Sequence, residues 1–76
     1  MELNTFIGNC AAQFDDTDAN LFTAETKFRE IDGWSSLIAL SIIAMVDEEY
    51  DVTLKGDDIR NAKTIQDLFD TVKSKI

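Results

Sequence analysis

The sequence contains no histidine, no proline and only one cysteine among its 76 residues. Without histidine there is no Ser-His-Asp triad, no imidazole general base and no His-ligated metal site. Cys10 has no partner for an intramolecular disulfide, and the N-terminus lacks a signal-peptide pattern, so a cytoplasmic protein is expected. The composition therefore argues against an enzyme and against a metal site.

Basic residues are also scarce. Seven Lys and Arg stand against 15 Asp and Glu, which gives a net charge of −8. Such a surface repels phosphate backbones, so no nucleic-acid partner is expected and basic partners are favoured. The longest apolar run, residues 37–46, is about half of the ~20 residues that span a membrane, so no membrane span is predicted. We expect one small domain over residues 1–76.

The apolar residues recur with helical spacing, and no alternating strand pattern is present. The first series predicts a helix through Phe14: Leu3, Phe6, Ile7, Cys10, Ala11 and Phe14. The acidic stretch 15–18 then predicts a turn, because short polar side chains compete for backbone hydrogen bonds. A calcium loop is disfavoured there, since the glycine and the distal glutamate of such a loop are missing.

A long connection over residues 15–35 follows, and such loops are usually functional or packed. Four apolar side chains are expected to anchor it: Leu21, Phe22, Phe28 and Ile31. Residues 23–29 are compatible with one turn of helix. Gly33 and Trp34 close the connection.

Three further helices are predicted. Residues 36–50 contain no glycine or proline and follow Ser35 or Ser36 as a cap. Asp57 is expected to cap a short helix ending at Asn61, and Thr64 with Asp67 predicts a capping box for the last one, whose apolar residues run to Ile76. The fold class is therefore all-α: a small four-helix bundle of three main helices plus one short helix, with a long loop between the first two.

The helix over residues 36–50 has two apolar stripes. One stripe consists of Ala39, Ile42, Ile43, Val46 and Tyr50, and the other of Leu37, Leu40 and Ala44, with Glu48 at its end. Either the second stripe is exposed as a binding surface, or the long loop covers it. The acidic run 47–51 lies where the helix dipole disfavours negative charge, which suggests a use, although a solvated polar face is the commoner reason for such a run.

Few side chains offer chemistry. Cys10 lies on the apolar stripe of the first helix and is expected to be a small buried hydrophobe. The hydroxyl of Ser36 would project at a helix N-terminus, where a phosphodiester would meet free backbone N–H groups. From spacing alone, a role of Ser36 as a cap and nothing more is the favoured interpretation.

The segment from Phe28 to Val46, FREIDGWSSLIALSIIAMV, with DEEYDV after it and TIQDLFDTV in the last helix, resembles the acyl carrier proteins and related peptidyl carrier domains. The resemblance covers essentially the whole chain. It implies a non-catalytic carrier with a 4′-phosphopantetheine arm on the serine of an Asp-Ser-Leu motif, and aligning that motif on Leu37 makes Ser36 the attachment site. Ser35 stands where the family has aspartate. Ser35 as the modified residue, or a domain that is never modified, are the alternatives.

The resemblance also implies that the second helix faces partner enzymes. The partner-binding residues would be Leu37, Leu40, Ala44, Asp47 and Glu48. The expected partners are a phosphopantetheinyl transferase and enzymes that load and transfer acyl or aminoacyl groups, and the protein itself is expected to be a monomer. Ile38 and Ser41 replace acids of many fatty-acid carriers, which favours a specialised pathway. The rival interpretation is an unmodified adaptor or regulatory protein that docks partners through Leu37 and Leu40.

Overall fold

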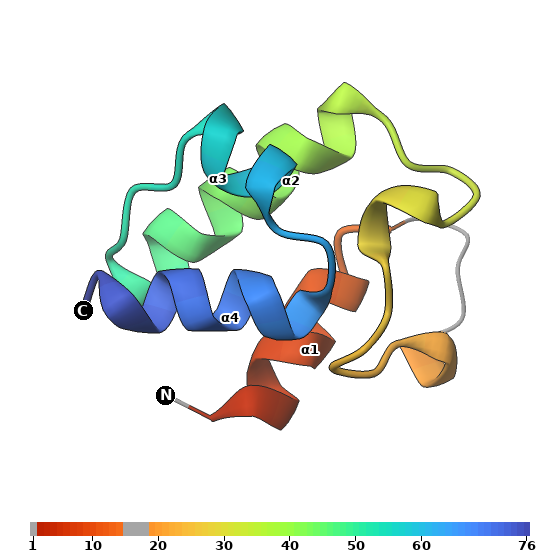
Figure 1. Ribbon diagram of the computed structural model, residues 1–76, viewed down its shortest axis with the longest axis horizontal. Coiled ribbons are helices and arrows are strands. Elements are labelled where there is room, and N and C mark those ends of the chain that lie inside the picture. The colour runs from red at the N-terminus through yellow and green to blue at the C-terminus, as the bar shows by residue number, and fades with distance from the viewer. Residues whose placement is uncertain (1, 15–18) are drawn as a thin grey trace.

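The computed structural model describes residues 2–14 and 19–76, which form helices joined by loops (Figure 1). The α-helices in these residues are α1 (Leu3–Ala11), α2 (Ser36–Tyr50), α3 (Gly56–Asn61) and α4 (Ile65–Ser74). Two short 3-10 helices, η1 (Ala19–Leu21) and η2 (Phe28–Glu30), lie in the long connection between α1 and α2. No strand occurs in these two stretches. The predicted all-α fold, a small bundle of three longer helices and one short helix, is confirmed.

The core lies between α1, α2 and α4. Helix α1 packs against both α2 and α4, and α3 packs against α4 (Figure 1). Phe6 is fully buried, with its ring centroid 5.7 Å from that of Tyr50 and 5.5 Å from that of Phe69. Around it lie fully buried aliphatic side chains of α2 and α4: Ile42, Val46, Ile65, Leu68 and Val72. These residues repeat at helical spacing, which is why each helix turns one face inward.

Helix α1 is shorter than predicted. It ends at Ala11, and the backbone N–H of Phe14 donates to the carbonyl of Ala11 in a turn at 3.0 Å. Phe14 is still buried, because its ring packs against that of Phe22 at 5.1 Å. An aromatic contact with the long connection has replaced the last helical turn. The turn predicted for residues 15–18 lies outside the described residues.

The ends of α3 and α4 follow the predicted capping pattern with two corrections. Asp57 does not cap α3; the N-cap is Lys55, whose N–H donates to the Asp58 carboxylate at 2.9 Å, so the helix begins two residues earlier than predicted. The capping box of α4 is confirmed, since Thr64 Oγ1 accepts from the N–H of Asp67 at 3.2 Å. Ile76 lies beyond the end of α4 and is 73% exposed, because the helix stops before it can reach the core.

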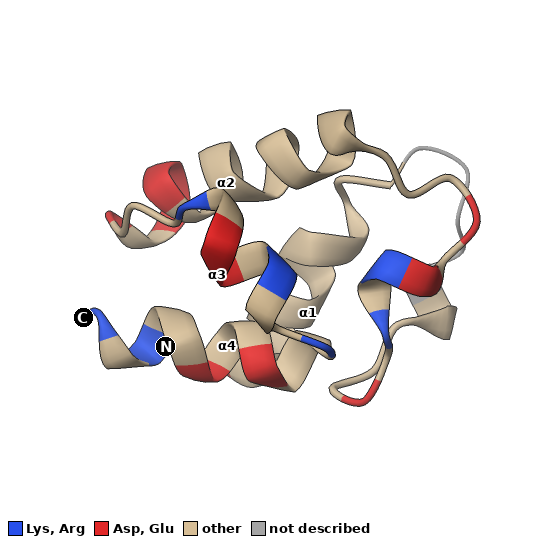
Figure 2. Ribbon diagram, turned by 45° about the horizontal axis from the view of Figure 1, so that its top comes forward, with Lys and Arg blue, Asp and Glu red and all other residues tan. Residues whose placement is uncertain are grey.

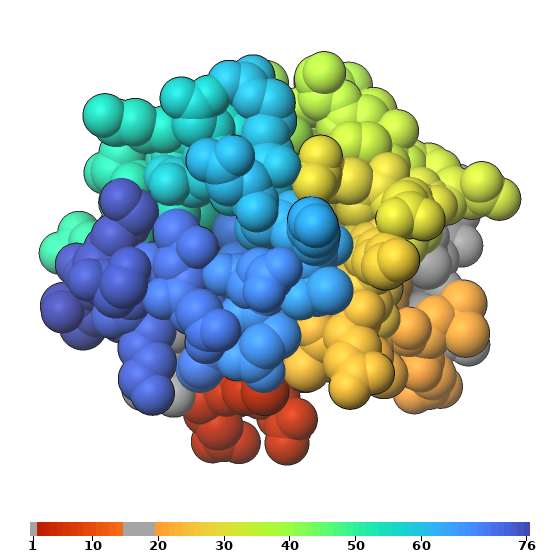
Figure 3. Space-filling model, viewed as in Figure 1, coloured from red at the N-terminus to blue at the C-terminus, as the bar shows by residue number. Residues whose placement is uncertain are grey.

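The long connection is fixed to the core and to the start of α4. Phe22 and Phe28 are buried as predicted, but Leu21 is 68% exposed because it lies in η1 on the outer side. The N–H of Ile65 donates to the carbonyl of Thr26 at 3.1 Å, and the N–H of Gln66 to that of Ala24 at 2.8 Å. Figure 3 shows this segment, in orange and yellow, lying directly against the beginning of α4. The loop therefore completes the bundle.

The helical turn expected within residues 23–29 is displaced. A turn closes between Thr23 and Thr26, whose N–H donates to the carbonyl of Thr23 at 3.1 Å, and η2 begins only at Phe28. Within the stretch that the structure covers, no helix has both the length and the apolar character needed to cross a membrane.

Candidate functional site

Ser36 is the first residue of α2. Ser35 is the N-cap: its Oγ accepts from the backbone N–H of Ile38 at 3.4 Å. The side chain of Ser36 is exposed, and its hydroxyl makes no hydrogen bond within the described residues. Since Ser35 caps the helix, the hydroxyl of Ser36 is available for chemistry at a helix N-terminus.

The approach to Ser36 is shaped by Gly33 and Trp34. Gly33 has φ of +94°, a conformation that side-chain-bearing residues rarely adopt, and this turn directs Trp34 back onto the core. The Trp34 ring packs edge-on against Phe28, with ring centroids 5.5 Å apart, and is tilted against Phe14, with centroids 6.1 Å apart. The start of α2 is thereby anchored to the aromatic residues of the loop.

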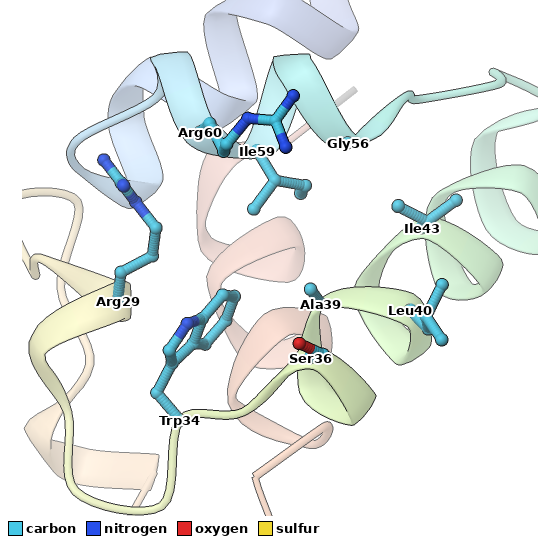
Figure 4. A pocket seen from close by; sticks show the side chains of 9 residues that line it. All are labelled: Arg29, Trp34, Ser36, Ala39, Leu40, Ile43, Gly56, Ile59 and Arg60. Atoms are coloured by element: carbon cyan, nitrogen blue, oxygen red, sulfur yellow. The ribbon is translucent and has the colours of Figure 1, made fainter.

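A cavity of about 450 Å³ opens beside Ser36 (Figure 4). It is lined by Arg29, Trp34, Ser36, Ala39, Leu40, Ile43, Gly56, Ile59 and Arg60. Helix α2 forms one wall and α3 the other, and the volume lies within the range of small-molecule sites. Arg29, Ile59 and Arg60 were not predicted from the sequence as site residues. Ile59, the one aliphatic residue in the short polar helix α3, was the signal that could have indicated this wall.

Helix α2 exposes its second apolar stripe. Leu37 is 74% exposed and Leu40 is 61% exposed, so the alternative in which the long loop covers this stripe is wrong. All five of the predicted partner-binding residues are exposed: Leu37, Leu40, Ala44, Asp47 and Glu48. On the opposite side Ile42 and Val46 are fully buried. An exposed apolar stripe on a helix of this kind marks an interaction surface.

Charge is separated along the same helix. Residues 36–46 carry none, whereas four acids occur between residues 47 and 51, and Figure 2 shows them gathered at the C-terminal end of α2. The surface beside Ser36 is therefore apolar, and the acidic surface lies at the far end of the helix.

Cys10 does not contribute to this site. Its side chain is 1% exposed, and burial raises the pKa of the thiol to about 12, so it stays protonated at physiological pH. Among the described residues, no cluster of three or more Cys, Asp or Glu side chains could hold a metal ion.

The four helices of the described residues and the exposed Ser36 at the start of α2 agree with the resemblance of the sequence to carrier proteins. An acyl carrier protein of Onion yellows phytoplasma (strain OY-M) is 33% identical over 51 residues, which cover 67% of this chain and 67% of that relative. No family model and no solved structure matches. The chain belongs to the acyl carrier protein family.

Proposed function

We propose that this protein holds acyl or aminoacyl intermediates on a 4′-phosphopantetheine arm attached to Ser36 and presents them to partner enzymes. The observation that carries the proposal is the state of the Ser36 hydroxyl, which is exposed and free of hydrogen bonds at the first position of α2. When attached, the arm supplies a thiol that carries the cargo as a thioester.

The residues present fit such an arm. In the modification step, Ser36 Oγ forms a bond to the phosphorus of a pantetheine-bearing pyrophosphate donor such as coenzyme A, and the bond from that phosphorus to the nucleotide phosphate breaks. The nucleotide leaves, and the hydroxyl proton passes to a base of the transferase. The N–H groups in the first turn of α2 and the positive end of its dipole favour the negative phosphodiester.

Partner enzymes would dock on the exposed stripe of α2. Leu37, Leu40 and Ala44 supply apolar contact close to Ser36, and Asp47 and Glu48 supply charge at the far end. Ile38 and Ser41 make this face less acidic than that of many fatty-acid carriers, which supports a specialised pathway. The net charge of −8 favours rapid encounter with basic partner surfaces, as suits a monomer that visits several enzymes in turn.

Intact mass spectrometry tests the proposal. After incubation with coenzyme A and a phosphopantetheinyl transferase, the protein should gain the mass of one phosphopantetheine. Ser36→Ala should abolish the gain, whereas Ser35→Ala should retain it, with circular dichroism confirming that both variants are folded. A gain that Ser35→Ala removes and Ser36→Ala does not would assign the arm to Ser35.

The alternative function is an unmodified adaptor that docks a partner through the same stripe. The exposure of Leu37 and Leu40 favours it as much as it favours a carrier, because both functions need an accessible apolar face. The mass measurement separates them, since no gain with any transferase would support the adaptor.

A further inference from the structure

The few basic residues of this acidic protein are clustered. Four of the seven, Lys27, Arg29, Arg60 and Lys63, line either the cavity beside Ser36 or a second hollow of about 400 Å³. Arg29 lines both, so the two adjoin, and Glu30 is the acid that lines the second hollow. Figure 2 shows the basic segments of η2, α3 and the α3–α4 connection facing the same region. The cavity therefore leads from Ser36 toward a concentration of positive charge.

Two arginines, Arg29 and Arg60, line the cavity, and of these Arg29 has no carboxylate partner among the described residues. Arg60 forms an ion pair with Asp57 within α3. One Nη of Arg29 donates to the carbonyl of Ala62 at 3.1 Å, but no carboxylate of the described residues forms an ion pair with it. This backbone contact holds the guanidinium at the rim of the cavity, beside the α3–α4 connection, and leaves its other N–H groups available (Figure 4).

The walls between Ser36 and Arg29 are apolar. Ala39 and Ile43 face Ile59 across the cavity, and the Trp34 indole lies between Arg29 and Ser36 (Figure 4). A group that enters from Ser36 would meet hydrocarbon first and the guanidinium last. An alkyl end there would cover a charged group without pairing it, whereas a carboxylate would form charge-assisted hydrogen bonds.

We propose that the cargo of this protein is an acyl group with a carboxylate at its far end, a dicarboxylic acyl group, whose methylenes lie against Ile43 and Ile59 and whose carboxylate pairs with Arg29. This inference rests on the proposed attachment of the arm to Ser36. It names the class of cargo that the cavity would retain.

The test compares two cargoes of equal chain length. The apo-protein is loaded by a transferase from hexanoyl- or adipoyl-coenzyme A, loading is verified by intact mass, and thermal unfolding is followed at low salt. The adipoyl form should melt about 2–4 °C above the hexanoyl form, because Arg29 is exposed and an exposed ion pair stabilises only weakly. Arg29→Gln should remove this difference, and Arg29→Lys should retain part of it.

Lys73→Gln is the matched control, because it removes a positive charge from α4 that lines neither hollow. It should leave the difference between the two cargoes unchanged. Circular dichroism of Arg29→Gln checks its fold, and the shift of the Trp34 indole N–H resonance on loading gives a second readout in the unsubstituted protein.

The outcomes distinguish the two proposals. If Ser36 is loaded and both cargoes give the same melting temperature and the same Trp34 shift, the dicarboxylic cargo is overturned and the carrier function stands. If the difference survives Arg29→Gln in a folded protein, Arg29 is not the carboxylate partner and the inference is overturned. If no arm can be attached, both proposals fall together.

Discussion

The hydroxyl of Ser35 accepts a hydrogen bond from the backbone N–H of Ile38, and this contact assigns the two adjacent serines different positions. Ser35 caps α2 from outside the helix, and Ser36 occupies its first turn. The residue at the position of the family aspartate thus caps the helix without carrying a negative charge. Substitutions at the two serines should therefore have different effects on stability.

Ser35→Ala should lower the free energy of unfolding by about 1 kcal/mol, because the N–H of Ile38 loses its acceptor. Ser35→Asp should raise it by about 0.5 kcal/mol, since a carboxylate can cap the helix and also interact with its dipole. Urea unfolding measures both changes. Ser36→Ala is the control and should alter stability by less than about 0.5 kcal/mol; a larger loss at Ser36 than at Ser35 would contradict the assigned cap.

Asp51 terminates α2 in the left-handed conformation, with φ of 56° and ψ of 40°. Asp51→Gly should stabilise the protein by about 0.5–1 kcal/mol, because glycine adopts this conformation without steric cost and a negative charge leaves the C-terminal end of the helix. Thermal and urea unfolding measure the gain. Asp51→Asn separates the two contributions, since it removes only the charge; a destabilised Asp51→Gly would argue against the left-handed cap.

Burial of Cys10 should make the free energy of unfolding fall as the pH rises above 9. Burial raises the pKa of the thiol from 9.0 to about 12, so above pH 9 the unfolded chain loses this proton while the folded chain keeps it. The stabilisation is complete below pH 9 and is lost between pH 9 and 12. The thiol should thus lower the unfolding free energy by about 1 kcal/mol between pH 9 and 10.

Cys10→Ala isolates this contribution, because every other titratable group is common to both proteins. The variant should be less stable at pH 7 owing to the cavity it creates, but its stability should fall less steeply above pH 9. Parallel pH profiles would show that the thiol does not titrate differently on unfolding. Thiol-reactive reagents should likewise modify the folded protein only as fast as it opens.

Leu40→Ala should weaken binding to a partner enzyme more than Asp47→Ala does. Leu40 is 61% exposed in the uncharged part of α2, so an enzyme that approaches Ser36 would bury it, whereas Asp47 lies at the far end. The affinity of the apo-protein for a transferase, measured at two salt concentrations, gives the comparison. Salt should diminish only the effect of Asp47→Ala.

Leu37→Ala is a useful companion, since Leu37 is 74% exposed and does not line the cavity. It should weaken binding as Leu40→Ala does, which would assign the loss to docking and not to the shape of the cavity. A greater loss at Asp47 than at both leucines, with unchanged unfolding free energies, would show that charge dominates recognition.

Helical periodicity predicted α1, α2 and α4 because each buries one regular face, whereas α3, in which only Ile59 is buried, was predicted from an expected cap. Ile65, Leu68 and Val72 of α4 are all fully buried, as their spacing requires. The end of α1 could not be predicted in this way. Phe14 continues the helical series in sequence, yet it leaves the helix to meet Phe22, and contacts between distant residues are invisible to local spacing.

The candidate site was only partly predictable for the same reason. Ser36 and the exposed face of α2 follow from a local motif and from the placement of apolar residues along one helix. Arg29 and Ile59 become neighbours of Ser36 only when η2 and α3 fold against α2, and nothing in the spacing between these segments indicates that they share a cavity. Residues that a motif contains were found, and those that the tertiary fold brings together were missed.

The contacts of Ile65 and Gln66 with the loop have a consequence for how the cavity opens. The backbone N–H groups in the first turn of α4 have no acceptor within the helix. The carbonyls of Thr26 and Ala24 accept hydrogen bonds from two of them, those of Ile65 and Gln66. The loop cannot lift to admit a cargo without breaking these bonds, so widening of the entrance and fraying of α4 should be one event. The hydrogen-exchange rates of these two amides should then report the equilibrium between the closed and the open form of the cavity.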